Sequence, residues 1–191
     1  PCYNPDNVGT VGPAGSICEG MLIVSQSMLF NNATWYYGGD ESYSVTGPDA
    51  TEYTFGDDGN NIFTGQVQSL AYLFYASRTV PDIGYWDTAQ VTSMAGLFYA
   101  SGGGGDLSNW ETGCVESMNG MFDIYAGTWP GTNLANWDTS SVQSMDRMFA
   151  DTALDTDISG LKTDGVASCT DFAKNSSSLQ VKLPSFSSCT P

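Results

Sequence analysis

The amino-acid sequence predicts an α/β repeat solenoid, a right-handed stack of about five repeats with short parallel strands, capped at both ends. The first observation behind this prediction is a short phrase that occurs in four near-copies and one weaker copy. The copies begin at valines that are spaced by 24, 24, 27 and 24 residues (Val67, Val91, Val115, Val142 and Val166). The second observation is a large apolar residue five positions before each of these valines (Ile62, Trp86, Trp110, Trp137 and Leu161). A period in the low twenties is typical of solenoids in which each repeat adds one strand and one short helix or turn.

Residues 1–56 do not repeat, and we expect them to form an N-terminal cap that is partly β. Residues 43–45 and 52–55 alternate between apolar and polar side chains, and Gly47-Pro-Asp between them is a turn signal. Val24-Ser-Gln-Ser-Met-Leu-Phe30 resembles the repeated phrase loosely, so a degenerate first repeat could be folded into the cap. The open end of a solenoid exposes strand edges and apolar side chains, and a cap covers them.

Residues 57–172 form the repeat region, and each repeat follows one plan. An extended segment carries the tryptophan and, two residues later, a threonine, both predicted to face the core. The phrase Val-x-x-Met-x-x-Met-Phe follows, and its spacing of three and four predicts one or two turns of helix. Stacking of the repeats would place Trp86, Trp110 and Trp137 in one column. Residues 173–191 are the predicted C-terminal cap.

Two repeats carry a specific family resemblance. The segments Leu107-Ser-Asn-Trp-Glu-Thr-Gly-Cys-Val-Glu-Ser-Met-Asn-Gly-Met-Phe122 and Leu134-Ala-Asn-Trp-Asp-Thr-Ser-Ser-Val-Gln-Ser-Met-Asp-Arg-Met-Phe149 resemble the WDTSxVxxMxxMF repeat of the BspA-like leucine-rich repeat surface-protein family. The resemblance implies a leucine-rich-repeat-like coil. It also implies an extracellular module of bacterial, protist and algal surfaces that acts in adhesion and protein–protein contact. The family has no catalytic residues to carry over.

Charge and composition restrict the possible partners. The chain has 21 acidic and five basic residues and no histidine, for a net charge of −16. Such a surface repels phosphate backbones and anionic lipid headgroups, which indicates no nucleic acid partner and no direct membrane insertion. Without histidine, Ser-His-Asp and Cys-His catalytic arrangements cannot form. We therefore expect a protein that is not an enzyme, although a carboxylate pair for glycoside cleavage stays formally possible.

The cysteines and the start of the sequence indicate an oxidising compartment. We expect two local disulfides, Cys2 with Cys18 and Cys169 with Cys189, each securing one end of the stack. Cys114 would then be a buried hydrophobe, an unpaired thiol or a link to another chain. Asn32 and Asn175 begin glycosylation sequons, and the chain reads as a mature protein after removal of a signal peptide. The expected location is extracellular, at the cell surface or in an oxidising lumen.

Acidic residues supply the candidate metal ligands. Directly after each tryptophan stands an acid, and a like-charge column of these residues could bind a divalent cation such as Ca²⁺ or a basic partner (Asp87, Glu111 and Asp138). The alternative is that the acids bond to turn amides or lie in water. Asp57 and Asp58 form a second oxygen-rich group, for which an Asp-Gly-Asn turn is the alternative. No other cofactor is expected.

The expected function is non-catalytic recognition or adhesion through contact with other proteins or glycans. Candidate contact residues are exposed aromatics and the odd cysteine (Trp35, Tyr36, Tyr37, Trp129 and Cys114), and Trp129 lies in the repeat with three extra residues. The alternatives are a structural building block of an extracellular filament, coat or surface assembly, which includes self-assembly, and a lumenal accessory subunit of a membrane complex.

Overall fold

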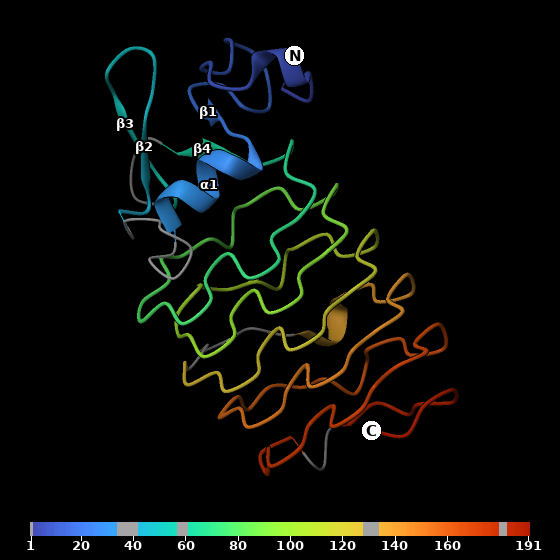
Figure 1. Ribbon diagram of the computed structural model, residues 1–191. Coiled ribbons are helices and arrows are strands. Elements are labelled where there is room, and N and C mark those ends of the chain that lie inside the picture. Colours follow the sequence, from blue (N-terminus) through green and yellow to red (C-terminus); the bar gives the residue numbers. More distant parts are fainter. Residues whose placement is uncertain (1, 34–41, 57–60, 128–133, 180–182) are drawn as a thin grey trace.

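The computed structural model describes residues 2–33, 42–56, 61–127, 134–179 and 183–191. Its α-helix and its strands lie together at the N-terminal end, and irregular backbone winds away from them toward the C-terminus (Figure 1). The elements in chain order are η1 (Pro5–Asn7), β1 (Leu22–Ile23), α1 (Gln26–Ala33), β2 (Ser44–Thr46), β3 (Glu52–Thr54), β4 (Ile62–Phe63) and η3 (Leu134–Asn136).

The N-terminal region contains two small sheets. Strands β2 and β3 pair antiparallel, with Val45 opposite Tyr53, so the predicted hairpin around Gly47 is confirmed. Strand β1 pairs in parallel with β4, with Leu22 opposite Ile62, and thereby ties the non-repeating segment to the start of the repeat region. Helix α1 follows Ser25, whose hydroxyl accepts a hydrogen bond from the main-chain N–H of Met28, as a helix N-cap does.

The predicted fold class is wrong. The described residues form two two-stranded sheets and one α-helix, all at the N-terminal end, and not an α/β leucine-rich-repeat solenoid. Beyond β4, the described residues contain one short 3-10 helix, η3, and no strand or α-helix. The strand predicted before Val67 is present as β4, whereas the segments before the other four valines form no strand, and the predicted helix in each phrase is a series of turns.

Backbone conformation explains why the phrase does not form a helix. Within each copy, the residues five and nine positions after the valine have positive φ, for example Tyr72 at 60° and Ala76 at 55°. A left-handed residue interrupts an α-helix. Each phrase therefore consists of overlapping four-residue turns, each closed by a hydrogen bond such as that from the Leu73 N–H to the Leu70 carbonyl. Turns of this kind bring the third or fourth residue to the same side. They therefore produce the apolar spacing that we attributed to a helix.

Successive copies of the phrase are joined by main-chain hydrogen bonds. The N–H groups of Leu70, Tyr72 and Phe74 donate to carbonyls of the following copy at 2.9, 2.8 and 3.1 Å. Single parallel bridges connect the serine two positions after each valine to the serine of the next copy (Ser69, Ser93, Ser117, Ser144 and Ser168). Each repeat therefore contacts its neighbours through the backbone, although none of the described segments between successive phrases pairs as a strand of two residues or more.

Side chains add a second set of contacts between repeats. Thr112 Oγ1 donates to the carbonyl of Asp138 at 3.1 Å, and Thr88 Oγ1 donates to that of Glu111 at 3.0 Å. The indole N–H of Trp110 donates to the carbonyl of Ile83 in the preceding repeat at 3.2 Å. These bonds satisfy buried polar atoms, which would otherwise be costly.

The core consists of the repeated apolar side chains. One column of phenylalanines has ring centroids 5.8, 5.6 and 5.3 Å apart (Phe74, Phe98, Phe122 and Phe149). Trp110 and Trp137 stack at 6.3 Å beside it. The valines and methionines of the phrase are also buried, so the prediction that they form the core is confirmed.

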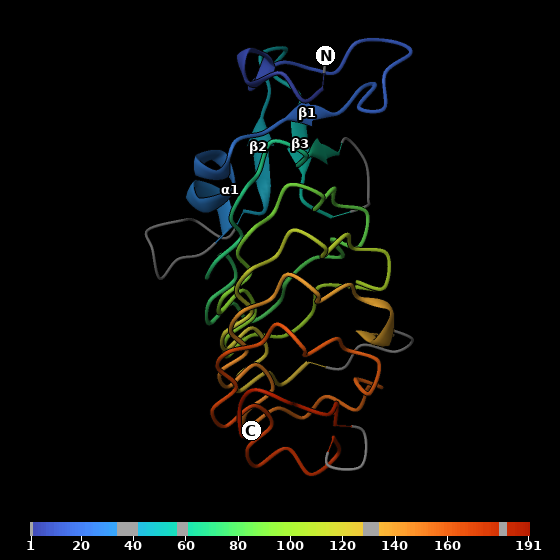
Figure 2. The ribbon, with the colours of Figure 1, turned by 90° about the vertical axis from the view of Figure 1, so that its right-hand side faces the viewer.

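Both ends of this core are covered by described residues. At the N-terminal end, Phe55 packs edge-on against Trp86, and Tyr43 lies against Phe74. At the other end, Phe186 packs edge-on against Phe172, with centroids 4.9 Å apart. The N-terminal elements lie beyond the first repeat and the C-terminal segment lies over the last (Figure 2).

Candidate functional site: a tyrosine groove

The surface formed by the turns of the phrase carries three tyrosines. Tyr75 and Tyr99, at the same position in successive repeats, stack with centroids 5.0 Å apart and planes 5° apart. Tyr72 lies 6.2 Å from Tyr75 and is 41% exposed. The stacking follows from the main-chain bonds between repeats, which place equivalent side chains side by side.

A glycine allows Tyr72 to lie across the next repeat. Gly96 has φ of +58°, and a Cβ at this position would overlap the ring of Tyr72. Gly120, the equivalent residue one repeat further, has the same φ and lies close to Tyr99. The two glycines therefore leave a hollow between the tyrosine rings and the following repeats.

This hollow is a groove of about 310 Å³, which we call the tyrosine groove. Aromatic rings lie at one end and polar groups at the other. The lining residues are Tyr72, Tyr75, Gly96, Tyr99, Asn119, Gly120, Asp123, Asp146 and Arg147. Burial and the nearby Asp123 carboxylate raise the pKa of Tyr99, so its phenol remains a hydrogen-bond donor at neutral pH.

Arg147 organises the charged end of the groove. Its Nε and Nη2 donate to the two carboxylate oxygens of Asp123 at 2.7 and 3.1 Å. The Asp123 side chain is only 3% exposed, and the guanidinium also contacts Asp151 at 3.0 Å and Asp171 at 3.6 Å. These carboxylates, Asp123 above all, raise the pKa of Arg147, so its charge is fixed.

Asn119 and Asp146 occupy equivalent positions and accept equivalent hydrogen bonds. Asn119 Oδ1 accepts from Ser144 Oγ at 2.5 Å and from the N–H of Asp146 at 2.9 Å. Asp146 Oδ1 accepts from Ser168 Oγ and from the N–H of Thr170, both at 2.6 Å. Partial burial raises the pKa of Asp146, but these hydrogen bonds outweigh it and the net shift is downward. The floor of the groove is therefore rigid and hydrogen-bonded.

The predicted acidic column has local partners. Asp87 accepts a hydrogen bond from the Tyr3 hydroxyl at 2.6 Å, and Asp138 pairs with Lys162 at 2.8 Å. Glu111 is exposed. In the described part of the chain, no three Asp, Glu or Cys residues come together as a metal site would require. Asp57 and Asp58 lie outside the described residues.

The structure describes only some of the predicted contact and glycosylation residues. Trp35, Tyr36, Tyr37 and Trp129 lie outside the described residues. Cys114 is exposed and has no disulfide partner among the described cysteines. Asn32 lies in α1, and its side-chain nitrogen donates to the Met28 carbonyl. Asn175 is exposed and donates to Asp151 at 2.8 Å. None of these described residues lines the tyrosine groove.

The other four cysteines are bonded in two pairs. Cys2 is bonded to Cys18 and Cys169 to Cys189, across separations of 16 and 20 residues. Two disulfides in a chain of this size indicate an oxidising environment. Among the described helices, none has the length and apolar character needed to cross a membrane.

Residues 68–186, more than half of the chain, match the family described as "Mycoplasma protein of unknown function, DUF285". The chain belongs to the DUF285 family. No curated protein and no solved structure matches it. The part of this DUF285 chain that matches contains every residue of the tyrosine groove.

Sequence reasoning did not identify the groove of this DUF285 chain. Tyr72, Tyr75 and Tyr99 lie within or just after the phrase, at positions that change from one repeat to the next. Because Tyr72 and Tyr75 are three residues apart, a helix would also place them on one face, but the periodic pattern of the phrase marks only its apolar core positions. The usable signal is the recurrence of tyrosine at 75 and 99, one full repeat apart.

Proposed function

We propose that this chain is a non-catalytic recognition module that binds another protein or a glycan through the tyrosine groove. The observation that carries the proposal is the tyrosine cluster, in which exposed Tyr72 lies beside the half-buried stack of Tyr75 and Tyr99, next to a hydrogen-bonded, charged floor. Tyrosine offers a large rigid apolar face and a hydroxyl, and it is enriched at binding surfaces for this reason. An apolar surface next to fixed polar groups gives both affinity and orientation.

We further propose that the module is extracellular or exposed at a cell surface. The two disulfides support an oxidising compartment, and the repeats resemble those of BspA-like surface proteins. Adhesion and protein–protein contact are the roles that this resemblance implies. The absence of histidine from the sequence supports a role without the common nucleophilic catalysis.

A structural building block is the second candidate. Exposed Cys114 favours it, because an accessible thiol can join two chains in an oxidising environment. The covered ends of the core favour recognition instead. Phe186 packs on Phe172 of the last repeat, so this end has no open core for a second chain to stack on. Mass measurement in solution, with and without reductant, separates the two. A monomer supports recognition, whereas polymers, or a dimer lost on reduction and in Cys114→Ser, support assembly.

A lumenal accessory subunit of a membrane complex would have the same surface chemistry. Fractionation of the native source distinguishes it, because such a subunit would sediment with membranes and leave them only with detergent. Release into the medium, or removal from intact cells by an external protease, supports the extracellular module.

The direct test of the groove compares three proteins on a glycan array and on a panel of secreted and surface proteins. These are the natural chain, the double variant Tyr75→Ser/Tyr99→Ser, and Tyr3→Ser as a control. Tyr3 is also an exposed tyrosine, 45% exposed, but it does not line the groove.

We expect ligands of the natural chain to bind Tyr3→Ser equally and the double variant at least about tenfold more weakly, as for loss of central aromatic contacts. Circular dichroism and melting temperature confirm that both variants fold. Unchanged binding by a folded double variant would exclude the groove as the recognition site.

A further inference from the structure

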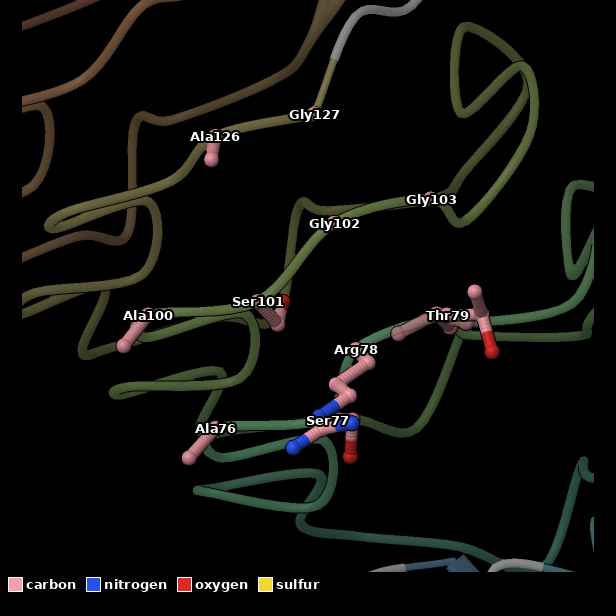
Figure 3. Close-up of a pocket in the computed structure, with 11 residues that line it drawn as sticks. Ala76, Ser77, Arg78, Thr79, Ala100, Ser101, Gly102, Gly103, Ala126 and Gly127 are labelled. Carbon is pink, nitrogen blue, oxygen red and sulfur yellow. The ribbon is translucent and has the colours of Figure 1, made fainter.

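A second cavity, separate from the tyrosine groove, is lined by the segments that directly follow the phrase in three successive repeats. Its volume is about 530 Å³, and its lining shares no residue with that of the groove. Figure 3 shows the lining chain segments one beyond the other, with Arg78 and Ser77 on one of them. The lining residues are Ala76, Ser77, Arg78, Thr79, Val80, Ala100, Ser101, Gly102, Gly103, Ala126 and Gly127.

Arg78 differs from the other described basic residues. Arg147, Lys162 and Lys174 each form an ion pair with an aspartate. Within the described part of the chain, Arg78 forms no ion pair, although acids outnumber bases 21 to five in the sequence. Exposed Arg78 therefore lines the cavity, and its guanidinium donors are not held by carboxylates of the described residues.

Ser77 gives an independent indication of a ligand. The residue is fully buried, and its hydroxyl has no hydrogen-bond partner among the described residues. The equivalent serine of the next repeat, Ser101, donates to the carbonyl of Phe98 at 3.0 Å, and Ser176 donates to that of Phe149 at 2.6 Å. A buried hydroxyl without a partner is unfavourable, and Ser77 is part of the cavity wall, so a ligand whose entry opens this wall would supply the missing partner.

The walls of the cavity are small and mostly apolar. Ala76 and Ala100 occupy equivalent positions in successive repeats, and Gly102 faces Gly127 of the repeat beyond. A Cβ on Gly102 would lie 3.6 Å from Gly127 and 3.7 Å from the Arg78 carbonyl, which is ordinary contact. The space is therefore open because the side chains are short, and a larger side chain at 102 would fill it.

We propose that this cavity binds a single carboxylate carried by a small, otherwise neutral molecule or residue. A guanidinium presents a planar fork of donors that matches the two oxygens of a carboxylate, and the Ser77 hydroxyl adds a further donor. The short apolar walls accept a compact neutral body of the size of one monosaccharide or one amino acid. The net charge of −16 repels polyanions, which restricts the ligand to one with an isolated negative charge.

A uronic acid and an N-acetylated amino acid both present this chemistry, and the test distinguishes them. The full chain is titrated with glucuronate, N-acetylalanine and glucose, and binding is followed by calorimetry and by NMR shifts of the cavity amides. We expect saturable binding of at least one carboxylate at millimolar concentration or below, and none of glucose. The carboxylate that binds more tightly shows whether the natural ligand is a uronic acid or an N-acetylated amino acid.

Three variants locate the binding site. Arg78→Gln and Gly102→Val should each weaken carboxylate binding at least about tenfold, as for loss of a charge-assisted hydrogen bond or of the space itself. Lys174→Gln, which removes an exposed positive charge outside the cavity, should bind as the natural chain does. Circular dichroism verifies the folding of each variant.

Three results would overturn the proposal: no saturable binding of either carboxylate, equal binding of glucose, or full binding by both folded cavity variants. The test is independent of the proposed function. Loss of carboxylate binding leaves the tyrosine groove unaltered, and the Tyr75→Ser/Tyr99→Ser variant leaves the cavity lining unaltered.

Discussion

Replacing Arg147 with glutamine should destabilise the protein substantially, although the residue is on the surface. The guanidinium is 40% exposed, but the Asp123 carboxylate that it binds is only 3% exposed. Arg147→Gln removes both hydrogen bonds to Asp123 and leaves a buried charge without its cation. The cost of that uncompensated charge, rather than the strength of a surface ion pair, determines the expected effect.

The magnitude follows from the burial of the two partners. Breaking a fully buried ion pair costs about 3–5 kcal/mol, and exposed pairs contribute about 0–1 kcal/mol. Because the guanidinium is partly exposed, water can reach the vacated position, and we expect about 2–3 kcal/mol. At this chain length the corresponding fall in melting temperature is about 4–12 °C.

Urea unfolding and scanning calorimetry measure the loss of stability. Two further variants test whether the buried charge of Asp123 causes it. Lys174→Gln breaks an ion pair with half-exposed partners and should cost less than about 1 kcal/mol. Adding Asp123→Asn to Arg147→Gln should restore most of the stability, because the buried group is then neutral. The reasoning is refuted if Arg147→Gln costs no more than Lys174→Gln, or if Asp123→Asn gives no recovery.

Three other predictions concern contacts between distant segments. Thr112→Val removes the hydrogen bond to the Asp138 carbonyl and should cost about 1 kcal/mol in urea unfolding, whereas Thr112→Ser should retain most of the stability. Lys162, with further hydrogen bonds from Ser140, lowers the pKa of Asp138 to about 2. Because the folded value is depressed, the stabilisation is present above the unfolded value of about 4. It should be lost as pH falls from 4 to 2, and Lys162→Met should reduce this dependence in acid unfolding curves and leave the part that Ser140 supports. The hydrogen bond to Asp87 raises the pKa of Tyr3 to about 12. Its stabilisation should therefore be present below pH 10 and decline toward pH 12, and ultraviolet difference titration should detect a late-ionising tyrosine whose pKa Asp87→Asn returns toward 10.

The sequence predicted the core better than the backbone. Apolar residues such as Val115, Met118 and Phe122 recur at one period and are buried, since only burial constrains a side chain to stay apolar in every copy. The hairpin around Gly47 was also predictable, because its turn residues have a local cause. The left-handed residues that prevent a helix were harder to predict, because Tyr72 gives no sign of them and glycine marks this position only in the next two repeats, at Gly96 and Gly120.

The groove could not be predicted for a related reason. The position eight residues after the valine, just beyond the phrase, holds Tyr75, Tyr99 and Asp123 in successive repeats, and this variation has no periodic pattern. The three side chains form the groove only because main-chain hydrogen bonds between repeats place them next to one another. Those bonds depend in turn on the alternation of right- and left-handed residues, which the sequence indicates only where glycine occupies a left-handed position, as at Gly96 and Gly120.

The same position therefore explains both the groove and its polarity. Two aromatic side chains stack on each other, and the third repeat replaces the ring with a carboxylate that holds Arg147. The backbone conformation is the same in these repeats, so only the side chains change from aromatic to charged. Because a uniform column of rings would have no polar end, the groove exists only where the repeat becomes irregular. Ligand orientation should accordingly depend on Arg147 and Asp123, and affinity on the tyrosines.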